Sequence, residues 1–232
     1  MRNLLILSLL LLIFPCFAAI TVVTENLPNF HYQNEKGELV GTVVDKVKAA
    51  LMRSGVNYTL SVNPWSVSYN AALRDSNTCI FSMARLPVRE AHFKWISKLS
   101  NFTVSFYSFK PEHINIANLG DAKRYRIAVL KDNYSHIYLA EHGFNEKNQL
   151  ILLNSFDNIY DILKSRRNSI DLVVLSDEQF NFALQQDPSL SSLKPVYEIP
   201  VGSQELYFAC NKNINNSTLE KLTNAFAFDD KK

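Results

Sequence analysis

The sequence predicts an α/β protein with two lobes, and three observations support this fold class. Short β-branched runs alternate with segments that have the periodicity of an amphipathic helix, an order typical of parallel strands joined by helices. The alternation starts again after Pro111, which follows a long aromatic and β-branched run. The chain has 232 residues, of which 47% are hydrophobic, so it is long enough for one large or two small domains with a real core.

The first α/β unit lies within the first hundred residues. Val43, Val47, Ala50 and Leu51 recur at helical spacing, and Gly55 closes this helix. The other expected elements of this unit are strands at 21–24, 39–40, 58–62 and 79–83 and a helical turn at 69–74.

The second unit follows the aromatic run and Pro111, and it continues almost to the end of the chain. Ser155 is typical of the N-cap of a helix with Phe156, Ile159 and Leu163 on one face. The other expected elements are strands at 102–109, 126–130, 149–153, 171–175 and 206–210 and helices at 135–142, 178–184 and 218–226.

These elements suggest a division of the mature chain into two lobes. We assign residues 20–101 and 211–232 to the first lobe, and residues 102–210, including the strands that join the lobes, to the second. In such a design a ligand lies in the crevice between the lobes, at the carboxyl ends of the strands.

Residues 1–19 are typical of a secretory signal peptide. One arginine precedes an apolar region at 4–14 and a small-x-small end, so cleavage is expected after Ala18 or Ala19. The apolar region is shorter than the roughly 20 residues of a transmembrane helix, which makes an uncleaved anchor the less favoured alternative. The mature chain is therefore expected to be exported and soluble.

Composition argues against several classes of partner. The net charge of +2 gives neither a nucleic-acid footprint nor an acidic tail. The chain has only six glycines and neither a GxGxxG nor a P-loop pattern. Its five histidines are scattered rather than at metal-ligand spacing. We therefore expect no cofactor, no metal and no nucleic-acid partner.

Two cysteines, Cys79 and Cys210, remain after removal of the signal peptide. Both lie in apolar, strand-like runs. An oxidising compartment allows them to pair, but two buried thiols are an equally good interpretation.

Two arginines stand where a buried strand is expected to end. Arg85 and Arg89 are four residues apart, and an aromatic run with Phe93 and Trp95 follows them. A guanidinium fork matches a planar carboxylate better than lysine does, so these residues are candidates for holding an anion. The alternative is a surface ion pair, for example between Arg89 and Glu90, which would contribute little.

Taken together, these segments resemble the periplasmic solute-binding proteins of amino-acid ABC importers, known as solute-binding family 3. Residues 36–41 with Asp45 are similar to the family's G-x-L-x-G-x-x-x-D segment, and residues 81–95 to its strand, T-x-x-R and aromatic segment. The resemblance covers about 21–226. It implies a type II periplasmic binding protein-like fold, or Venus flytrap, with the ligand cleft between two lobes.

The resemblance implies that Arg89, six residues before Trp95, grips the carboxylate of the ligand. Relatives carry Ser or Thr five residues before this arginine, but this sequence has Ala84, while Ser82 remains available. Arg85 is either a second anion contact or a brace to the other lobe.

The aromatic platform of the family maps near Leu27, where stacking over the ligand is lost. Phe30, Trp65 or Tyr69 could supply it instead. For Trp65, packing in the core is the alternative role.

The second lobe departs further from the family pattern. Residues 131–135 lack the glycine that relatives place at a helix N-terminus, so Asn133 or Ser135 is expected to cap the helix. The acid that binds the ligand's amino group maps to Ser176 without a gap, or to Asp177 with one inserted residue. Asp177 has the N-cap of the following helix as its alternative role.

We therefore expect a periplasmic, monomeric protein that is not an enzyme. It would close its lobes around a small anionic or zwitterionic, amino-acid-like solute and deliver it to a membrane partner. That partner is either the permease of an ABC importer or a membrane sensor. A dehydratase-type enzyme on the same fold, with a carboxylate of Asp177 or Glu178 as the acid, is the alternative from a different class.

Overall fold

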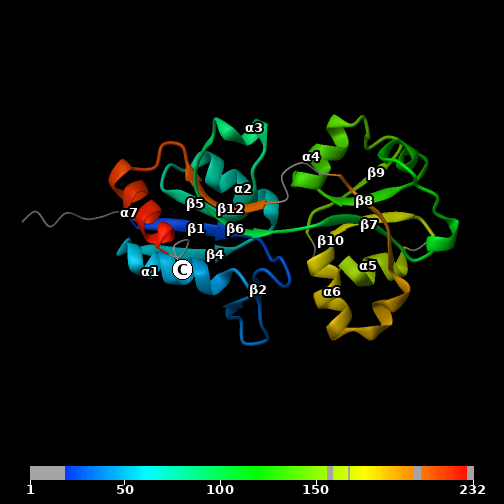
Figure 1. Cartoon of the computed structure of the whole chain (residues 1–232), viewed down its shortest axis with the longest axis horizontal. Coiled ribbons are helices and arrows are strands. Elements are labelled where there is room, and N and C mark those ends of the chain that lie inside the picture. The colour runs from blue at the N-terminus through cyan, green and yellow to red at the C-terminus, as the bar shows by residue number, and fades with distance from the viewer. Residues whose placement is uncertain (1–18, 156–158, 167, 201–204, 229–232) are drawn as a thin grey trace, which may run out of the picture.

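The computed structural model describes residues 19–155, 159–166, 168–200 and 205–228, which form two lobes side by side (Figure 1). Each lobe contains a five-stranded sheet, and helices pack against both sheets. The predicted two-lobe α/β fold is therefore confirmed. The signal-peptide prediction falls on residues 1–19, of which 1–18 lie outside the described part of the chain.

The first lobe is built on a mixed sheet with the strand order β4-β1-β5-β12-β6. Strand β1 pairs in parallel with β4 and β5, as the alternation of strands and helices predicted, whereas β12 is antiparallel to both β5 and β6. The strands are β1 (Ile20–Thr24), β4 (Tyr58–Val62), β5 (Thr78–Ala84), β6 (Phe93–Asn101) and β12 (Glu205–Asn211).

Helices cover the two faces of this sheet, as Figure 1 shows. Helices α1 (Val44–Ser54) and α7 (Asn216–Ala227) pack together over one face, and α2 (Trp65–Arg74) packs on the other. Gly55 ends α1 with a φ of +63°, as its sequence position predicted. Side chains alternate along the first part of β5, so Cys79 and Phe81 face one helical layer and Ile80 faces the other. The alternation breaks at Ser82, whose φ is +58°, and Met83 therefore packs in the same layer as Ile80.

The second lobe has the strand order β11-β7-β10-β8-β9. Strand β8 pairs in parallel with both β9 and β10, and β7 runs antiparallel to β10 and β11. The strands are β7 (Val104–Ser108), β8 (Ile127–Leu130), β9 (Leu150–Leu153), β10 (Leu172–Ser176) and β11 (Lys194–Glu198), and the helices are α4 (Tyr134–Glu141), α5 (Ile159–Ser165) and α6 (Asp177–Gln186).

The position of β12 differs from the predicted lobe boundary. We predicted that residues up to 210 belong to the second lobe, but Glu205–Asn211 pairs with β5 and β6 in the sheet of the first lobe. The chain passes from β6 to β7 at 102–103 and returns between β11 and β12. A single sequence does not show which strands pair when they lie more than a hundred residues apart. The predicted lobe boundary therefore missed the pairing of β12 with the first sheet.

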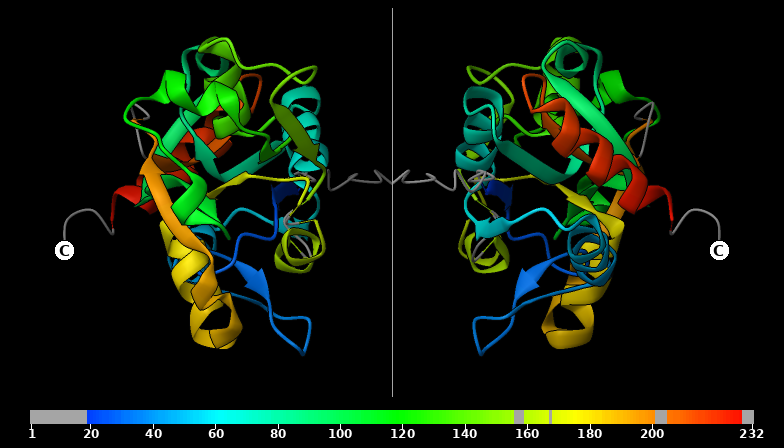
Figure 2. Two further views of the ribbon diagram at one scale, coloured as in Figure 1. Left: turned by 90° about the vertical axis from the view of Figure 1, so that its right-hand side faces the viewer. Right: turned by 90° about the vertical axis from the view of Figure 1, so that its left-hand side faces the viewer.

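Several elements were not predicted. They are β2 (Tyr32–Gln33), α3 (Pro87–Glu90), strands β6 and β11, and 3-10 helices at Pro111–His113, Leu119–Arg124 and Pro188–Ser192. Strand β3 (Leu39–Val40) was predicted, and it pairs with β2. Figures 1 and 2 show the hairpin of β2 and β3 extending from the first lobe, and the Tyr32 ring lies 5.0 Å from that of Phe182 in α6.

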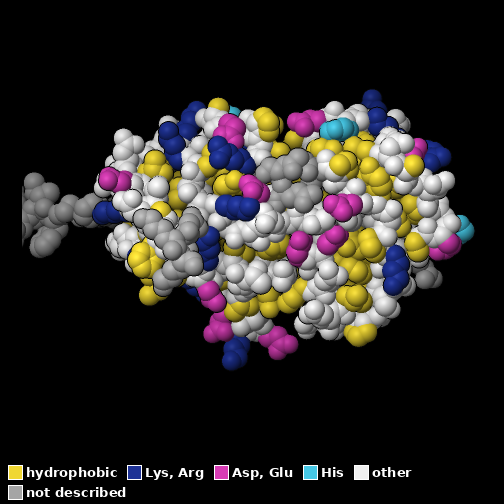
Figure 3. All heavy atoms as spheres, in the orientation of Figure 1, with side chains coloured by type: hydrophobic (Ala, Val, Ile, Leu, Met, Phe, Trp, Pro, Cys, Tyr) yellow, Lys and Arg dark blue, Asp and Glu magenta, His cyan; other side chains and the backbone are white. Residues whose placement is uncertain are grey.

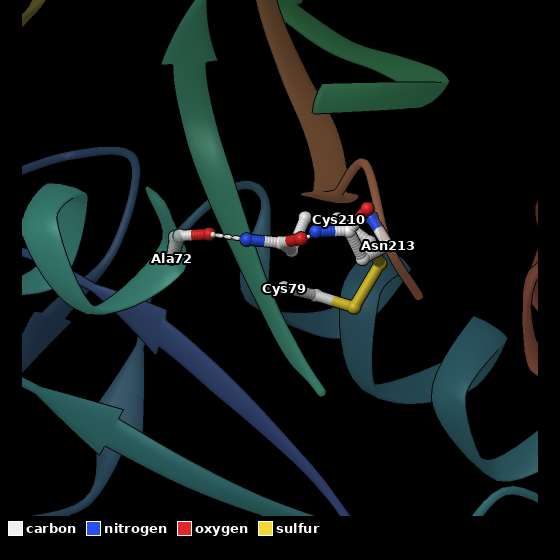
Figure 4. The surroundings of a disulfide bond; sticks show 5 residues. Ala72, Cys79, Cys210 and Asn213 are labelled. Atoms are coloured by element: carbon white, nitrogen blue, oxygen red, sulfur yellow. Dashed lines mark hydrogen bonds between the residues drawn. A yellow bond between two sulfur atoms is a disulfide. The ribbon is translucent and has the colours of Figure 1, made fainter. Parts of the chain in front are cut away.

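Cys79 and Cys210 form a disulfide between neighbouring strands β5 and β12 (Figure 4). The structure thus decides between the two interpretations of the cysteines in favour of a bridge. Beside it, Nδ2 of Asn211 donates a 2.9 Å hydrogen bond to the carbonyl of Ala72. Both contacts attach the returning strand β12 to the centre of the first lobe.

The helices of the described residues include none with the length and hydrophobicity needed to cross a membrane. Acidic and basic side chains are interspersed over the face shown in Figure 3. This agrees with the nearly balanced composition of 24 basic and 22 acidic residues.

Candidate ligand site between the lobes

Both lobes contribute to one cavity with about 560 Å³ of space between its walls, including the part open to solvent. Most of the wall is apolar and includes Leu27, Phe30 and Leu206 from the first lobe and Val104 and Val174 from the second. A mainly apolar wall with a few polar groups is typical of small-molecule sites.

The cavity lies where strands end, as expected for α/β sheets. Ser82 and Ala84 come from the end of β5, and Glu25 directly follows β1. Ser176 ends β10 in the second lobe. The end of a buried strand brings a polar side chain into an otherwise apolar region without interrupting the sheet.

Arg89 is fully buried in the short helix α3 and lines the cavity. Its Nη1 donates to the carbonyl of Ala84 at 3.0 Å, and its Nη2 donates to the carbonyl of Asp132 in the other lobe at 3.2 Å. Its Nε is buried and has no hydrogen-bond partner among the described residues. Burial lowers the pKa of the Arg89 guanidinium, and interactions with Tyr69, Glu25 and Asp132 partly offset this shift.

Ser82 also lines the cavity and is 5% exposed. Its Oγ has no hydrogen-bond partner in the described part of the chain. Its φ of +58° places it in the left-handed region, which is uncommon for a residue other than glycine. Such conformations cost free energy and cluster at functional sites.

Arg85 lies outside the cavity lining, and neither predicted role fits its position. Its guanidinium forms two hydrogen bonds to the Glu90 carboxylate, at 2.6 and 3.1 Å, on the exposed surface. It also lies over the rings of Trp95 and Tyr207, at 5.3 and 5.7 Å. The surface ion pair considered for Arg89 is therefore formed by Arg85, because the turn of α3 directs Arg89 inward.

The aromatic candidates lie close together around Arg89. The Trp65 ring lies 5.6 Å from that of Tyr69, and the guanidinium carbon of Arg89 lies 5.1 and 4.9 Å from these two ring centroids. Trp65 and Phe30 line the cavity, whereas Tyr69, whose ring stacks on that of Trp65, is not among the lining residues. Trp65 is also packed in the core, so its two predicted roles coexist.

Asp177 is not among the lining residues. Its Oδ1 accepts a 2.7 Å hydrogen bond from the hydroxyl of Tyr107 inside the second lobe. Asp177 is also not the N-cap of α6: Ser176 has that position and forms a capping box with Gln179. Ser176 and Gln179 both line the cavity.

Asn133 and Ser135 line the cavity from the start of α4. Oδ1 of Asn133 accepts from the main-chain N–H of His136 at 2.9 Å, which confirms the capping role predicted for it. Glu25 is a lining residue that the sequence-based predictions missed, although its place just after β1 was a usable signal. The residues described contain no cluster of three or more His, Cys, Asp or Glu side chains suited to a metal ion.

The solved structures that resemble this chain include binding proteins and a sensor domain. A histidine kinase sensor domain with similarity to periplasmic binding proteins matches with a TM-score of 0.79 and 18% identity, over 92% of this chain and 90% of that chain. An ancestral arginine-binding protein bound to glutamine matches with a TM-score of 0.76 and 22% identity, over 92% of each chain. The amino acid ABC transporter substrate-binding protein AbpA from Streptococcus pneumoniae, bound to L-arginine, matches with a TM-score of 0.75 and 14% identity, over 92% of this chain and 89% of that chain.

No protein-family model matches the sequence, and a search of curated proteins gives no match. At 14 to 22% identity, the structural likeness establishes the fold of the chain. The two-lobe periplasmic binding protein-like architecture is thus shared, while the ligand has to be argued from the cavity itself.

Proposed function

We propose that this chain is an exported binding protein that captures a small, carboxylate-bearing, amino-acid-like solute between its lobes. One observation carries the proposal: Ser82 Oγ and Arg89 Nε are buried polar atoms without partners among the described residues, and both residues line the same cavity. We call these two atoms the donor pair. An unsatisfied buried polar group is costly, so an acceptor on the ligand would be stabilised there.

A carboxylate fits the donor pair better than a neutral acceptor. Arg89 is cationic, and hydrogen bonds between ionised partners are stronger than neutral ones. Phe30 and Trp65 supply apolar and aromatic surface for the body of the solute. Glu25, a further lining residue, carries the charge needed to face a cationic group of a zwitterion.

Catalysis is not part of this proposal. Asp177, one candidate for the catalytic acid of an enzyme, accepts a hydrogen bond from the hydroxyl of Tyr107. The carboxylate oxygens of Glu178, the other candidate, accept from the main-chain N–H of Thr103 at 3.2 Å. Both carboxylates therefore stabilise the second lobe, and neither residue is among those lining the cavity.

The proposed setting is the periplasm, reached by a signal peptide cleaved after Ala18 or Ala19, with the chain acting as a monomer. The partner is either an ABC permease or a membrane sensor. Likeness to both a transporter protein and a kinase sensor domain supports these two candidates. Crosslinking in intact cells, followed by identification of the partner as a permease or a kinase, distinguishes them.

The proposal is tested by native mass spectrometry of the mature protein, followed by calorimetric titration of the solute that co-purifies and of a panel of L-amino acids. Arg85 and Arg89 provide a matched pair of substitutions. Arg89→Lys is expected to weaken binding at least about tenfold because lysine has no Nε–H to complete the donor pair, whereas Arg85→Lys changes it less than about twofold. Ser82→Ala is expected to weaken binding about fivefold.

Two results would overturn the proposal. One is the absence of any co-purifying solute together with no binding across the panel. The other is an Arg89→Lys variant that binds as tightly as the unchanged protein.

A further inference from the structure

The carbonyl oxygen of Asp132 is a point where the two lobes are hydrogen-bonded to each other. Nε1 of Trp65 donates to it at 2.7 Å, and Nη2 of Arg89 donates to it at 3.2 Å. Both donors belong to the first lobe, while Asp132 lies in the turn between β8 and α4 of the second. One main-chain acceptor thus uses both of its lone pairs on the opposite lobe.

The backbone of Asp132 is held in the conformation that presents this carbonyl. Its φ is +59°, in the left-handed region that Asp adopts more readily than most residues. Its N–H donates to Nδ1 of His136 at 3.0 Å. The neighbouring Asn133 caps α4, so the turn is fixed at both of its ends.

Both donor residues of this contact are buried. Trp65 is 4% exposed and Arg89 is fully buried, so both donors are removed from competing water. A single apolar cluster extends across the boundary between the lobes and includes Phe30 from the first lobe and Tyr134 from the second. At a separate point the rings of Tyr32 and Phe182 meet across the lobes at 5.0 Å.

We infer that Trp65, Arg89 and the Asp132 carbonyl form an interlobe latch that helps to hold the lobes together in the absence of a solute. The latch also makes Asp132 a positioning residue for the candidate site. With Nη1 on Ala84 and Nη2 on Asp132, the guanidinium is fixed so that Nε is the nitrogen left for a ligand. Closure thus completes the orientation of Arg89 before any solute adds its own contacts.

The first part of the inference is independent of the proposed solute, so its test uses none. Spin labels attached at Val88→Cys on α3 and Glu141→Cys on α4, both exposed positions on opposite lobes, report the separation of the lobes by double electron–electron resonance. The mature protein is first unfolded and refolded with its disulfide intact, which removes co-purified solute.

Trp65→Phe keeps the aromatic ring and removes the N–H, so the ratio of closed to open molecules is expected to fall about fivefold. The double variant Trp65→Phe with Arg89→Met removes both donors and is expected to lower this ratio by more than about tenfold. Asp132→Asn is the matched control: asparagine tolerates the left-handed region and keeps the carbonyl in place, so the distance distribution should not change. Asp132→Val disfavours that region and should open the lobes.

The inference is overturned if the double variant has the same distance distribution as the parent, or if Asp132→Asn opens the lobes as much as Asp132→Val. The first result would mean that the apolar contacts alone hold the lobes together. The second would assign the effect to the carboxylate rather than to the carbonyl. Neither result would contradict the proposal that a solute binds, because calorimetry tests solute binding separately.

Discussion

The hydroxyl of Tyr107 in β7 donates a 2.7 Å hydrogen bond to the carboxylate of Asp177, the first residue of α6. Tyr107 is 2% exposed, and its ring lies 4.5 Å from that of Phe180. Burial raises the pKa of Tyr107, and its hydrogen bond to Asp177 raises it further. The carboxylate of Asp177 therefore links strand β7 to helix α6 within the second lobe.

This relationship predicts that Asp177 contributes to stability rather than to ligand affinity. Asp177→Ala is expected to lower the free energy of unfolding by about 1–3 kcal/mol, the usual cost of leaving a buried donor, here the Tyr107 hydroxyl, without its partner. Its affinity for the co-purifying solute should stay within about threefold, in the range of a change that removes no direct contact. Urea unfolding and calorimetry measure the two quantities.

Tyr107→Phe is the partner variant in a double-mutant cycle. Because both changes remove the same hydrogen bond, their effects on stability should not add, with a coupling of about 1–2 kcal/mol. A large loss of affinity for the solute in Asp177→Ala would contradict this prediction and indicate that Asp177 takes part in binding.

The helices and strands with clear local sequence patterns were predicted close to their observed positions. The helical spacing of Val47 and Leu51, with Gly55 after them, indicated α1 almost to its ends. The fully buried run of β5 was equally clear. Strand β6 was missed because exposed lysines interrupt it and two register shifts break its pairing with β12.

The candidate site was predictable only where side-chain type carries the information. Arg89 and Ser82 could be named because a guanidinium and a hydroxyl at the end of a strand suggest an anion. The Asp132 carbonyl could not, since every residue has one and its direction depends on a backbone angle. Arg85 and Arg89 could be ranked from the sequence, but the turn of α3 decides which of them is buried.

The disulfide between Cys79 and Cys210 is expected to be a major contributor to stability. It closes a separation of 131 residues in the sequence, for which the chain-entropy model gives at most about 5 kcal/mol. Replacing both cysteines by alanine should lower the free energy of unfolding by about 2–5 kcal/mol. Denaturant titrations measure this loss.

Reduction provides the control for the disulfide. Adding a thiol reductant should destabilise the parent protein and leave the double alanine variant unaffected. If the reductant shifted both proteins equally, the bridge would not be the source of the stability.

Gly41 is required by its close approach to the main chain of the cavity wall. Its φ is +133°, and a Cβ at this position would overlap the main-chain carbonyl of Phe30. Gly41→Ala should therefore displace Phe30, cost about 3 kcal/mol or more, and weaken solute binding. Thermal unfolding and calorimetry measure both effects.

Gly37 is the matched control, because it also has a positive φ, +76°, but a Cβ added there would meet no residue within 4 Å beyond its chain neighbours. Gly37→Ala should cost only the backbone strain, about 1–2 kcal/mol, with no effect on affinity. Equal losses in the two variants would show that strain, and not the contact with Phe30, dominates at Gly41.

His31 is expected to make the protein less stable in mild acid. Its ring is fully buried, and Nδ1 donates to the carbonyl of Glu25 at 3.0 Å while the ring edge meets Phe81. Burial lowers the pKa of His31 to about 4, although the hydrogen bond to Glu25 acts in the opposite direction. The unfolded chain therefore binds a proton near pH 6.5 that the folded chain does not take up until about pH 4.

Because the unfolded state binds more protons in this window, stability is lost as the pH falls from about 6.5 to about 4 and changes no further below it. The loss due to His31 is expected to reach about 3 kcal/mol. Urea midpoints measured from about pH 7.5 to about pH 4.5, a range that spans most of this window, should fall more steeply for the parent than for His31→Gln, which cannot titrate. Carboxylates titrate in both proteins, so the difference between the two curves isolates His31, and parallel curves would contradict the prediction.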